Sequence, residues 1–130
     1  MRPPTMIFDR FDLIVVPFPF VDSPRTKPRP ALVLSNRDLN QANGHTVLAM
    51  VTRATHTRWP SDHEIEELGP TGLRDPSVVR FKLFTLDNRI LQRRIGRLGD
   101  SDARACAAAL EAAFRDETRR SRDQADERHR

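Results

Sequence analysis

The chain has little cysteine and no long apolar segment. Its single cysteine, Cys106, cannot form an internal disulfide, which excludes a disulfide-stabilised secreted fold and fits a reducing compartment. Cys106 stands among alanines at helical spacing, so we interpret it as a small buried apolar residue. No apolar run reaches the length of a signal peptide or a membrane-spanning helix. We therefore expect a cytoplasmic protein with no membrane partner, and a chain of 130 residues suffices for one domain.

Lysine is also scarce, because the 22 basic residues include only two lysines, Lys27 and Lys82. Nearly all positive charge is thus carried by arginine, whose planar guanidinium pairs with phosphate through two parallel hydrogen bonds. The net charge of +4 and the pI near 10.5 favour a polyanionic partner, although a GC-rich genome produces the same arginine bias. Cysteine and histidine do not cluster at the spacing of metal ligands, so the sequence predicts no metal and no cofactor.

Short β-rich runs separated by turn residues predict a mainly β fold. Apolar and β-branched side chains concentrate in four runs, with two weaker segments in addition: 11–20, 31–35, 46–52 and 77–86, then 63–68 and 89–98. The first run should bend or end at Pro17 and Pro19. Asn43-Gly44 is a strong turn signal, and the three runs at 11–20, 31–35 and 46–52 are close together and joined by turns rather than helices, so we expect them to pair antiparallel. The run at 77–86 alternates, which predicts that one face packs and the other carries charge.

The remaining segments predict one helix and two polar regions. Apolar residues recur at helical spacing from Ala103 to Phe114, which predicts an amphipathic C-terminal helix. Five or six strands and this helix describe a small, partly closed β-barrel of SH3-like character. The proline-rich segment at 21–30 should be an exposed loop. We divide the chain into three parts: an N-terminal extension at 1–10, a barrel domain at 11–114, and a charged tail at 115–130 that is either a frayed helix or disordered.

Four local sequences together resemble the MazF/PemK family of toxin ribonucleases. They are DLIVVPFPF at 12–20, KPRPALVLSN at 27–36, VLAMVT at 47–52, and SVVRFKLFTLD followed by RRIGRL between 77 and 98. They occur in the family's order and at its spacing, and the pairing of PFPF with RPALVLS is the most specific part. The resemblance implies an SH3-like barrel of the kind shared by MazF and CcdB. It also implies a homodimeric toxin of a type II toxin–antitoxin system.

The resemblance further implies an activity and the residues that perform it. The family cleaves single-stranded mRNA without a metal, and a cognate antitoxin places an extended segment in the RNA groove. The family's catalytic arginine falls on Arg29, and its catalytic threonine falls on Thr52. Cleavage through the substrate's own 2′-hydroxyl needs only proton transfer and charge stabilisation, which suit an arginine on the phosphate and a threonine that donates one hydrogen bond. Without the resemblance they would be a surface arginine and an ordinary strand-end threonine.

Other residues near these two positions are candidate RNA contacts. We assign RNA binding to a group of basic residues for which a solvated loop or strand face is the alternative: Lys27, Arg53, Arg58, Arg80 and Lys82. Trp59 could stack on an unpaired base or cap the barrel. The general base is not identified, because His45, His56 and His63 each lie in a polar segment where a solvated histidine is the commoner explanation.

Three positions depart from the family's pattern. Phe11 stands where many relatives have glycine, Arg53 where many have a second hydroxyl residue, and Lys82 where some have an aspartate. The last departure leaves open whether that position takes part in proton transfer.

Two other functions also stay open. A toxin similar to CcdB, which binds DNA gyrase, would share the barrel but would have no chemical need for Arg29 together with Thr52. A catalytically inactive module would bind RNA or protein without cutting RNA.

Overall fold

The computed structural model describes residues 5–18, 27–55 and 57–117. Within these ranges the chain forms the following elements: β1 (Asp12–Pro17), β2 (Pro28–Val33), α1 (Arg37–Asn43), β3 (His45–Arg53), β4 (His63–Glu64), the 3₁₀ turn η1 (Gly69–Thr71), β5 (Ser77–Asp87), the 3₁₀ turn η2 (Asn88–Ile90), β6 (Arg93–Arg97) and α2 (Asp100–Ala113). No helix in the described part of the chain is both long and apolar enough to cross a membrane. The loop expected at 21–30 and the tail expected at 115–130 lie largely outside the described residues, but the predicted end of that loop is wrong, because β2 begins at Pro28 rather than at Ala31.

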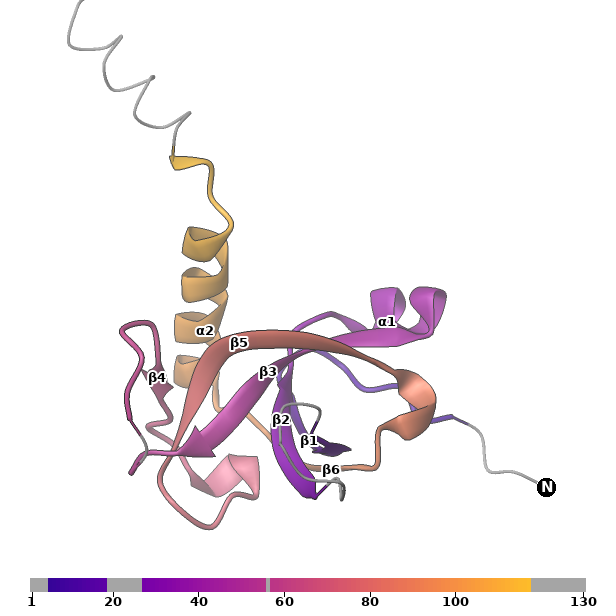
Figure 1. Cartoon of the computed structure of the whole chain (residues 1–130), viewed down its shortest axis with the longest axis horizontal. Helices are drawn as coiled ribbons and strands as arrows, with labels where there is room; N and C mark the ends of the chain where they lie inside the picture. The colour runs from indigo at the N-terminus through magenta and orange to yellow at the C-terminus, as the bar shows by residue number, and fades with distance from the viewer. Residues whose placement is uncertain (1–4, 19–26, 56, 118–130) are drawn as a thin grey trace, which may run out of the picture.

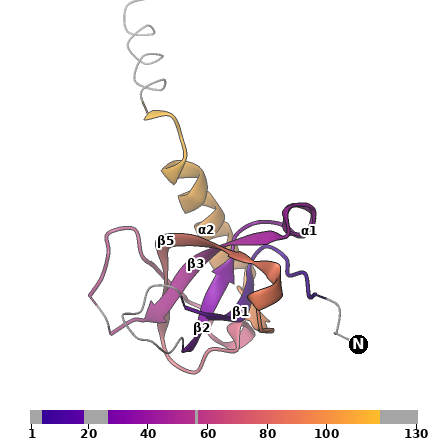
Figure 2. The same ribbon diagram turned by 45° about the vertical axis from the view of Figure 1, so that its right-hand side comes forward.

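The strands join one antiparallel sheet in the order β4-β5-β3-β2-β1-β6. Figure 1 shows the sheet curling into a half-barrel, with β5 arching beside β3, and with α2 standing on the outer side. The turned view in Figure 2 shows the same curl, with α1 projecting from the sheet. The prediction of a mainly β, partly closed SH3-like barrel with a C-terminal helix is therefore confirmed.

The curled sheet buries side chains on both of its faces. The concave face encloses one apolar cluster: Phe8, Ile14, Val16, Phe18, Ala31, Val33, Leu48, Phe84 and Leu91. The outer face packs against α2 and the segment around β4 in a second cluster: Leu13, Leu32, Leu34, Ala49, Val51, Ile65, Val79, Leu98 and Cys106. Because successive strand residues point to opposite faces, a strand buried on both sides reads as a continuous apolar run. This explains the unbroken apolar stretches of β1, β2 and β3.

The prediction that one face of the run at 77–86 would carry charge is wrong. Val78 and Val79 are both fully buried, while Leu83 and Phe84 pack in opposite clusters. The alternation was set by charged residues such as Arg80, yet this side chain is itself buried, at 8% exposure. Tertiary packing overrides the local pattern here, because β4 pairs with the outer edge of β5 and α2 covers its face.

A helix, α1, replaces the turn predicted between β2 and β3. Asn36 caps its start, since its side-chain oxygen accepts a hydrogen bond from the amide of Leu39 at 2.9 Å. Gly44 ends it in the left-handed conformation with φ of 69°. Asn43-Gly44 is thus the end of a helix rather than a hairpin turn; both structures place glycine at positive φ, so the dipeptide alone does not separate them. β2 and β3 still pair antiparallel, as predicted.

The weaker predicted strands are shorter in the structure than in the sequence pattern. The first part of the segment at 89–98 belongs to η2, and only Arg93–Arg97 pairs with β1. The segment at 63–68 contributes only the two residues of β4. These two strands form the edges of the sheet. β1 ends at Pro17, as predicted from the lack of an amide donor in proline.

Phe11 adopts a left-handed backbone conformation, with φ of 71°, and no other non-glycine residue in the described ranges does so. It is one of the three positions at which the sequence departs from the pattern of the family that it resembles. Its amide donates to the carbonyl of Val33 at 2.7 Å, and its carbonyl accepts from the amide of Leu98 at 3.0 Å. The ring packs against the outer cluster and lies under the guanidinium of Arg10, 4.6 Å from its carbon. These contacts hold a conformation that disfavours any side chain with a Cβ.

Phe11→Gly should be more stable than Phe11→Ala by about 1 kcal/mol, although alanine is the better residue in most elements. Both variants lose the ring, so their difference isolates the backbone strain at φ of 71°. Urea unfolding of the two variants measures it. The same pair of substitutions at Thr85, an exposed residue in β5, is the matched control and should give the ordinary order. If Phe11→Ala proves the more stable of the two, the position is not strained.

A buried carboxylate fastens α2 to the segment around β4. Asp102 is 1% exposed and accepts hydrogen bonds from the backbone amides of Glu66 and Glu67, both at 3.0 Å. One of its oxygens lies 2.8 Å from Nε2 of His63. Burial alone would raise the pKa of Asp102, but the hydrogen bonds outweigh it and the pKa is lowered. Cys106, one turn further along α2, is fully buried as predicted, and burial raises the pKa of its thiol to about 12.

The lowered pKa of Asp102 makes the attachment of α2 sensitive to acid. A carboxyl whose pKa is lowered by folding stabilises the fold above its unfolded value of 3.8, and this stabilisation is lost as the pH falls through the folded value. Asp102→Asn should therefore lower the stability by about 2 kcal/mol at neutral pH and by less as the pH falls below 3.8. Melting temperatures measured from neutral to acidic pH test this. Asp100→Asn, at an exposed site in the same turn, is the control. A deficit of constant size at every pH would contradict the assignment.

Candidate active site

The register between β2 and β3 brings Arg29 and Thr52 together. Ala31 pairs with Met50, and the same antiparallel register continued by two residues places Arg29 opposite Thr52. Both lie on the concave face, because Ala31 belongs to the inner apolar cluster and Met50 packs against it. Two residues from separate sequence motifs therefore lie on neighbouring strands and on the same face of the sheet.

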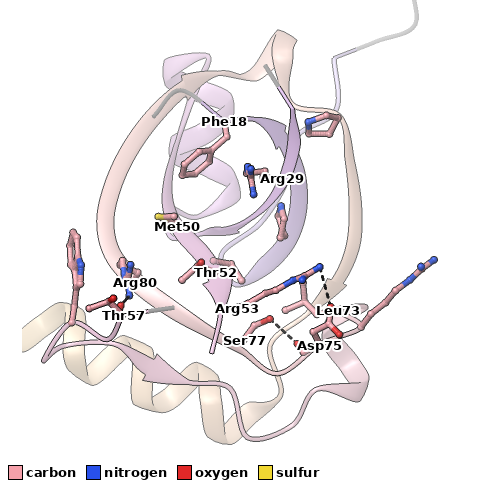
Figure 3. A pocket seen from close by; sticks show the side chains of 15 residues that line it. Phe18, Arg29, Met50, Thr52, Arg53, Thr57, Leu73, Asp75, Ser77 and Arg80 are labelled. Atoms are coloured by element: carbon pink, nitrogen blue, oxygen red, sulfur yellow. Dashed lines mark hydrogen bonds and ion pairs between the residues drawn. The ribbon is translucent and has the colours of Figure 1, made fainter. Parts of the chain in front are cut away.

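A cavity of about 780 Å³ opens at this end of the sheet. Four residues predicted as catalytic or RNA-binding line it: Arg29, Thr52, Arg53 and Arg80. Figure 3 shows Arg29 and Thr52 inside the curl of the sheet, with Arg80 to one side of them. Three predicted RNA contacts lie outside the lining: Lys27, Arg58 and Lys82.

The arginines of the cavity differ in how far their charge is already balanced. Arg53 lies 3.6 Å from Asp75, but both side chains are more than half exposed, so the pair is screened and weak. Arg29 is exposed, and no carboxylate in the described residues pairs with it. Arg74 also lines the cavity without an acidic partner among those residues. Two guanidinium groups are thus available to an anion that enters here.

Arg80 is fixed by its neighbours. Its Nε donates to Oδ1 of Asp62 at 3.1 Å, its NH2 donates to Oδ2 at 2.8 Å, and NH2 also donates to the carbonyl of Thr57. The hydrogen bonds from Arg80 lower the pKa of Asp62, which keeps this carboxylate ionised. The guanidinium carbon also lies 4.8 Å from the ring centre of Trp59. Arg80 therefore attaches the loop between β3 and β4 to the cavity wall, and its charge is balanced by Asp62.

The three predicted RNA contacts outside the lining have distinct surroundings. Lys27 is exposed directly before β2. Arg58 is exposed on the loop after β3, and its NH2 lies 3.5 Å from a carboxylate oxygen of Glu64. Lys82 is half-buried in a bulge of β5, where two residues are inserted opposite the step from Ala49 to Met50 in β3. None of these three side chains lines the cavity.

Sequence reasoning missed part of the cavity wall, which includes Phe18, Leu73, Arg74, Asp75 and Ser77. Most of these follow Gly72, which has φ of 74° and packs against the backbone of Ile95. A Cβ at Gly72 would lie 2.1 Å from the carbonyl oxygen of Ile95, so only glycine lets the chain pass here. The sequence showed Gly72 as a break between elements, but a glycine does not reveal which surface the following loop reaches.

No histidine among the described residues lines the cavity. Nε2 of His63 lies 2.8 Å from the carboxylate of Asp102. Nδ1 of the exposed His45 lies 3.1 Å from the carbonyl of Asn43. His56, the third histidine considered as a base, lies outside the described residues. The described ranges also contain no group of three His, Cys, Asp or Glu side chains that could share a metal ion. For proton transfer, the described part of the cavity offers hydroxyl groups and the carboxylate of Asp75.

The half-barrel with a basic cavity at one end places the chain among small β-barrel proteins, and solved structures share this fold. The Mycobacterium tuberculosis toxin MazF-mt6 is similar, with 25% identity and a TM-score of 0.63 over 79% of this chain and 95% of that one. A MazE–MazF complex from Deinococcus radiodurans has 19% identity and a TM-score of 0.64 over 84% and 96% of the two chains. A mycobacterial endoribonuclease in complex with its cognate antitoxin has 18% identity and a TM-score of 0.65 over 82% and 93%. At 18% and 19% identity, the last two similarities show a shared fold and nothing more.

Residues 9–114 match the family of PemK-like, MazF-like toxins of type II toxin–antitoxin systems, and the chain belongs to this family. The resemblance predicted from the four motifs is thereby confirmed, together with the role as a type II toxin. The alternative of a gyrase-binding toxin finds no support in these comparisons. No curated protein matches the sequence at a significant level.

Proposed function

We propose that this toxin is an endoribonuclease that cuts single-stranded mRNA in the cytoplasm, with Arg29 and Thr52 as its catalytic residues and without a metal. The observation that carries this proposal is the meeting of these two side chains in one basic cavity. A toxin that only binds another protein has no chemical reason to place them together. Membership of the MazF-like family and the likeness to a mycobacterial endoribonuclease support the same activity.

The proposed reaction uses a nucleophile that the substrate already carries. The 2′-hydroxyl attacks the adjacent phosphorus, and the bond from phosphorus to the 5′-oxygen breaks. One fragment ends in a 2′,3′-cyclic phosphate and the other begins with a 5′-hydroxyl, so the proton lost by the 2′-oxygen is balanced by one gained at the 5′-oxygen. Arg29 would hold two non-bridging oxygens and stabilise the extra negative charge of the transition state. Thr52 would donate a hydrogen bond to the phosphate or accept one from the 2′-hydroxyl.

The other basic residues would position the RNA strand. Arg53 and Arg74, which line the cavity beside the catalytic pair, are suited to the phosphates nearest the cut. The exposed Lys27 and Arg58 would contact the strand further out, and Lys82 stays a candidate at the bulge of β5. Arg80 would act by holding its loop in place, because its charge is balanced by a carboxylate.

A cognate antitoxin is the proposed protein partner, and a second copy of this chain is the proposed dimer partner. Solved relatives include a MazE–MazF complex and an endoribonuclease bound to its cognate antitoxin. An extended antitoxin segment with acidic side chains would compete with RNA for Arg29 and Arg74, since both lack an acidic partner among the described residues. Toxin neutralisation and RNA exclusion would then be one event.

The test is to incubate the purified full chain with a long single-stranded RNA in EDTA. We expect discrete cuts, with fragments that end in a 2′,3′-cyclic phosphate. DNA of the same sequence and RNA methylated on its 2′-oxygens should stay intact, because neither has the attacking hydroxyl. Arg104→Ala, at an exposed arginine on α2 away from the cavity, is the control and should cut like the parent chain. Intact RNA would disprove the proposal, and bound but uncut RNA would identify an inactive binding module.

A further inference from the structure

Trp59 is a large aromatic side chain that lies partly exposed on the wall of the cavity. It is the single tryptophan of the chain, it is 41% exposed, and it lines the same cavity as Arg29 and Thr52. It belongs to neither apolar cluster, so it does not cap the barrel core. An exposed indole leaves a flat apolar surface in water, which favours any ligand that can cover it.

The tryptophan is held in position before any ligand arrives. Its backbone amide donates to Oδ2 of Asp62 at 2.9 Å, and the amide of Asp62 donates back to the carbonyl of Trp59 at 3.0 Å. Pro60 follows directly and fixes φ at the second position of this turn. Arg80, bound to both oxygens of Asp62, lies over the indole ring at 4.8 Å. A guanidinium group therefore lies over the ring, and the 41% of the side chain that stays exposed is open to a ligand.

We infer that Trp59 is a stacking platform for an unpaired base of the RNA strand bound in the cavity. The base would lie on the exposed part of the indole, so that Arg80, Trp59 and the base form one stack in the wall of the cavity that Arg29 and Thr52 also line. This inference rests on the proposed function, because the bound strand supplies the base. A single strand offers exposed base faces and a duplex does not, so the platform gives the toxin a physical reason to select unpaired RNA. Little ordering entropy is lost, since the ring is already fixed.

The fluorescence of Trp59 tests the contact directly. The chain has one tryptophan and no tyrosine, so emission excited at the red edge of the absorption band reports Trp59 alone. The full chain is titrated with a 2′-O-methylated RNA 20-mer of mixed sequence, which it cannot cut. We expect a loss of emission that saturates with the RNA, and protection of the indole from acrylamide. The same RNA annealed to its complement should leave the emission unchanged, because its bases are paired.

Substitution separates stacking from a general effect on the fold. Trp59→Ala should weaken binding of the labelled 20-mer and raise KM for cleavage by about 10-fold, with little change in kcat, whereas Trp59→Phe should keep most of the affinity. Phe114→Ala removes another exposed aromatic ring, on the far end of α2, and is the matched control with no expected effect. Unchanged affinity in Trp59→Ala, or unchanged emission at saturating RNA, would overturn the platform while RNA cleavage still stood. Saturable loss of emission with a chain that cuts no RNA would support the platform and reject the proposed nuclease.

Discussion

Arg29→Ala is expected to lower kcat for RNA cleavage by about 10³-fold, which corresponds to about 4 kcal/mol of transition-state stabilisation. The five-coordinate phosphorus carries more negative charge than the starting phosphodiester, and Arg29 is the cavity cation that lies opposite Thr52 without an acidic partner among the described residues. Arg29→Lys keeps the charge but loses the planar pair of donors, so its rate should fall between those of the parent and the alanine variant. Single-turnover rates at one mapped cut site, with the protein in excess, measure the effect without contribution from product release.

Thr52 and the matched controls complete this test. Thr52→Val removes the hydroxyl and keeps the shape, so it should slow cleavage by about 10- to 100-fold, whereas Thr85→Val, on the exposed part of β5, should not. Arg53→Ala should raise KM more than it lowers kcat, since Arg53 is exposed and already paired with Asp75. Arg104→Ala controls for the loss of one positive charge. A parent-like rate in Arg29→Ala would move the catalytic charge elsewhere, and Arg74 would be the next residue to substitute.

The strands and the antiparallel pairing of the first three runs were predictable, because apolar runs of this length between turn residues allow few alternatives, whereas the order of all six strands was not predicted. The helix α1 was not, since Asn43-Gly44 serves a helix end and a hairpin equally well and the run after Asn36 has little apolar periodicity. The charge pattern of β5 also misled, because it reports neither the helix packed behind the strand nor the carboxylate that neutralises Arg80. Those facts depend on contacts between residues far apart in the chain.

That Arg29 and Thr52, the proposed catalytic pair, would lie in one cavity was predictable for a similar reason, whereas the rest of the cavity wall was not. Arg29 and Thr52 lie two residues beyond the Ala31–Met50 pair of two adjacent strands, so a short continuation of one register places them opposite each other. The wall formed after Gly72 depends on a close approach to Ile95, which no local pattern reveals. The sequence left two roles open for Trp59, stacking on a base or capping the barrel, because the contacts of its ring depend on the fold. In the structure Trp59 lies in neither apolar cluster and contacts Arg80.

The buried side-chain amide of Asn40 connects α1 to the barrel, and a carboxylate could not make the same hydrogen bonds because it has no N–H donors. Asn40 is fully buried, and its Nδ2 donates to the carbonyls of Phe8 and Ser35, both at 3.0 Å. Its Oδ1 accepts from the hydroxyl of Ser35, and its backbone carbonyl accepts from Nδ2 of Asn88 at 2.8 Å. No other described side chain donates a hydrogen bond to these two carbonyl oxygens. A carboxylate at this position would face both oxygens with lone pairs only.

Asn40→Asp should therefore be the most destabilising of the single-atom changes considered for this chain, at about 4 kcal/mol near neutral pH. Burial and the two facing carbonyls would raise the pKa of the new carboxyl in the folded state. Its deficit is then smallest below the unfolded pKa of about 3.9, where the group is protonated in both states, and grows as the pH rises. Urea unfolding at neutral pH and near pH 4 measures both the size and the sign.

The matched control lies in the same helix and is the same chemical change. Asn36 caps the start of α1 from an exposed site, so Asn36→Asp keeps the acceptor for the amide of Leu39 and adds negative charge at the positive end of the helix. It should be neutral or stabilising by about 0.5 kcal/mol, and its benefit should vanish as the pH falls. Opposite signs and opposite pH trends would assign the difference to donors and acceptors at Asn40. If Asn40→Asp tracked Asn36→Asp instead, the buried amide would contribute packing alone, and α1 would be held by its other contacts.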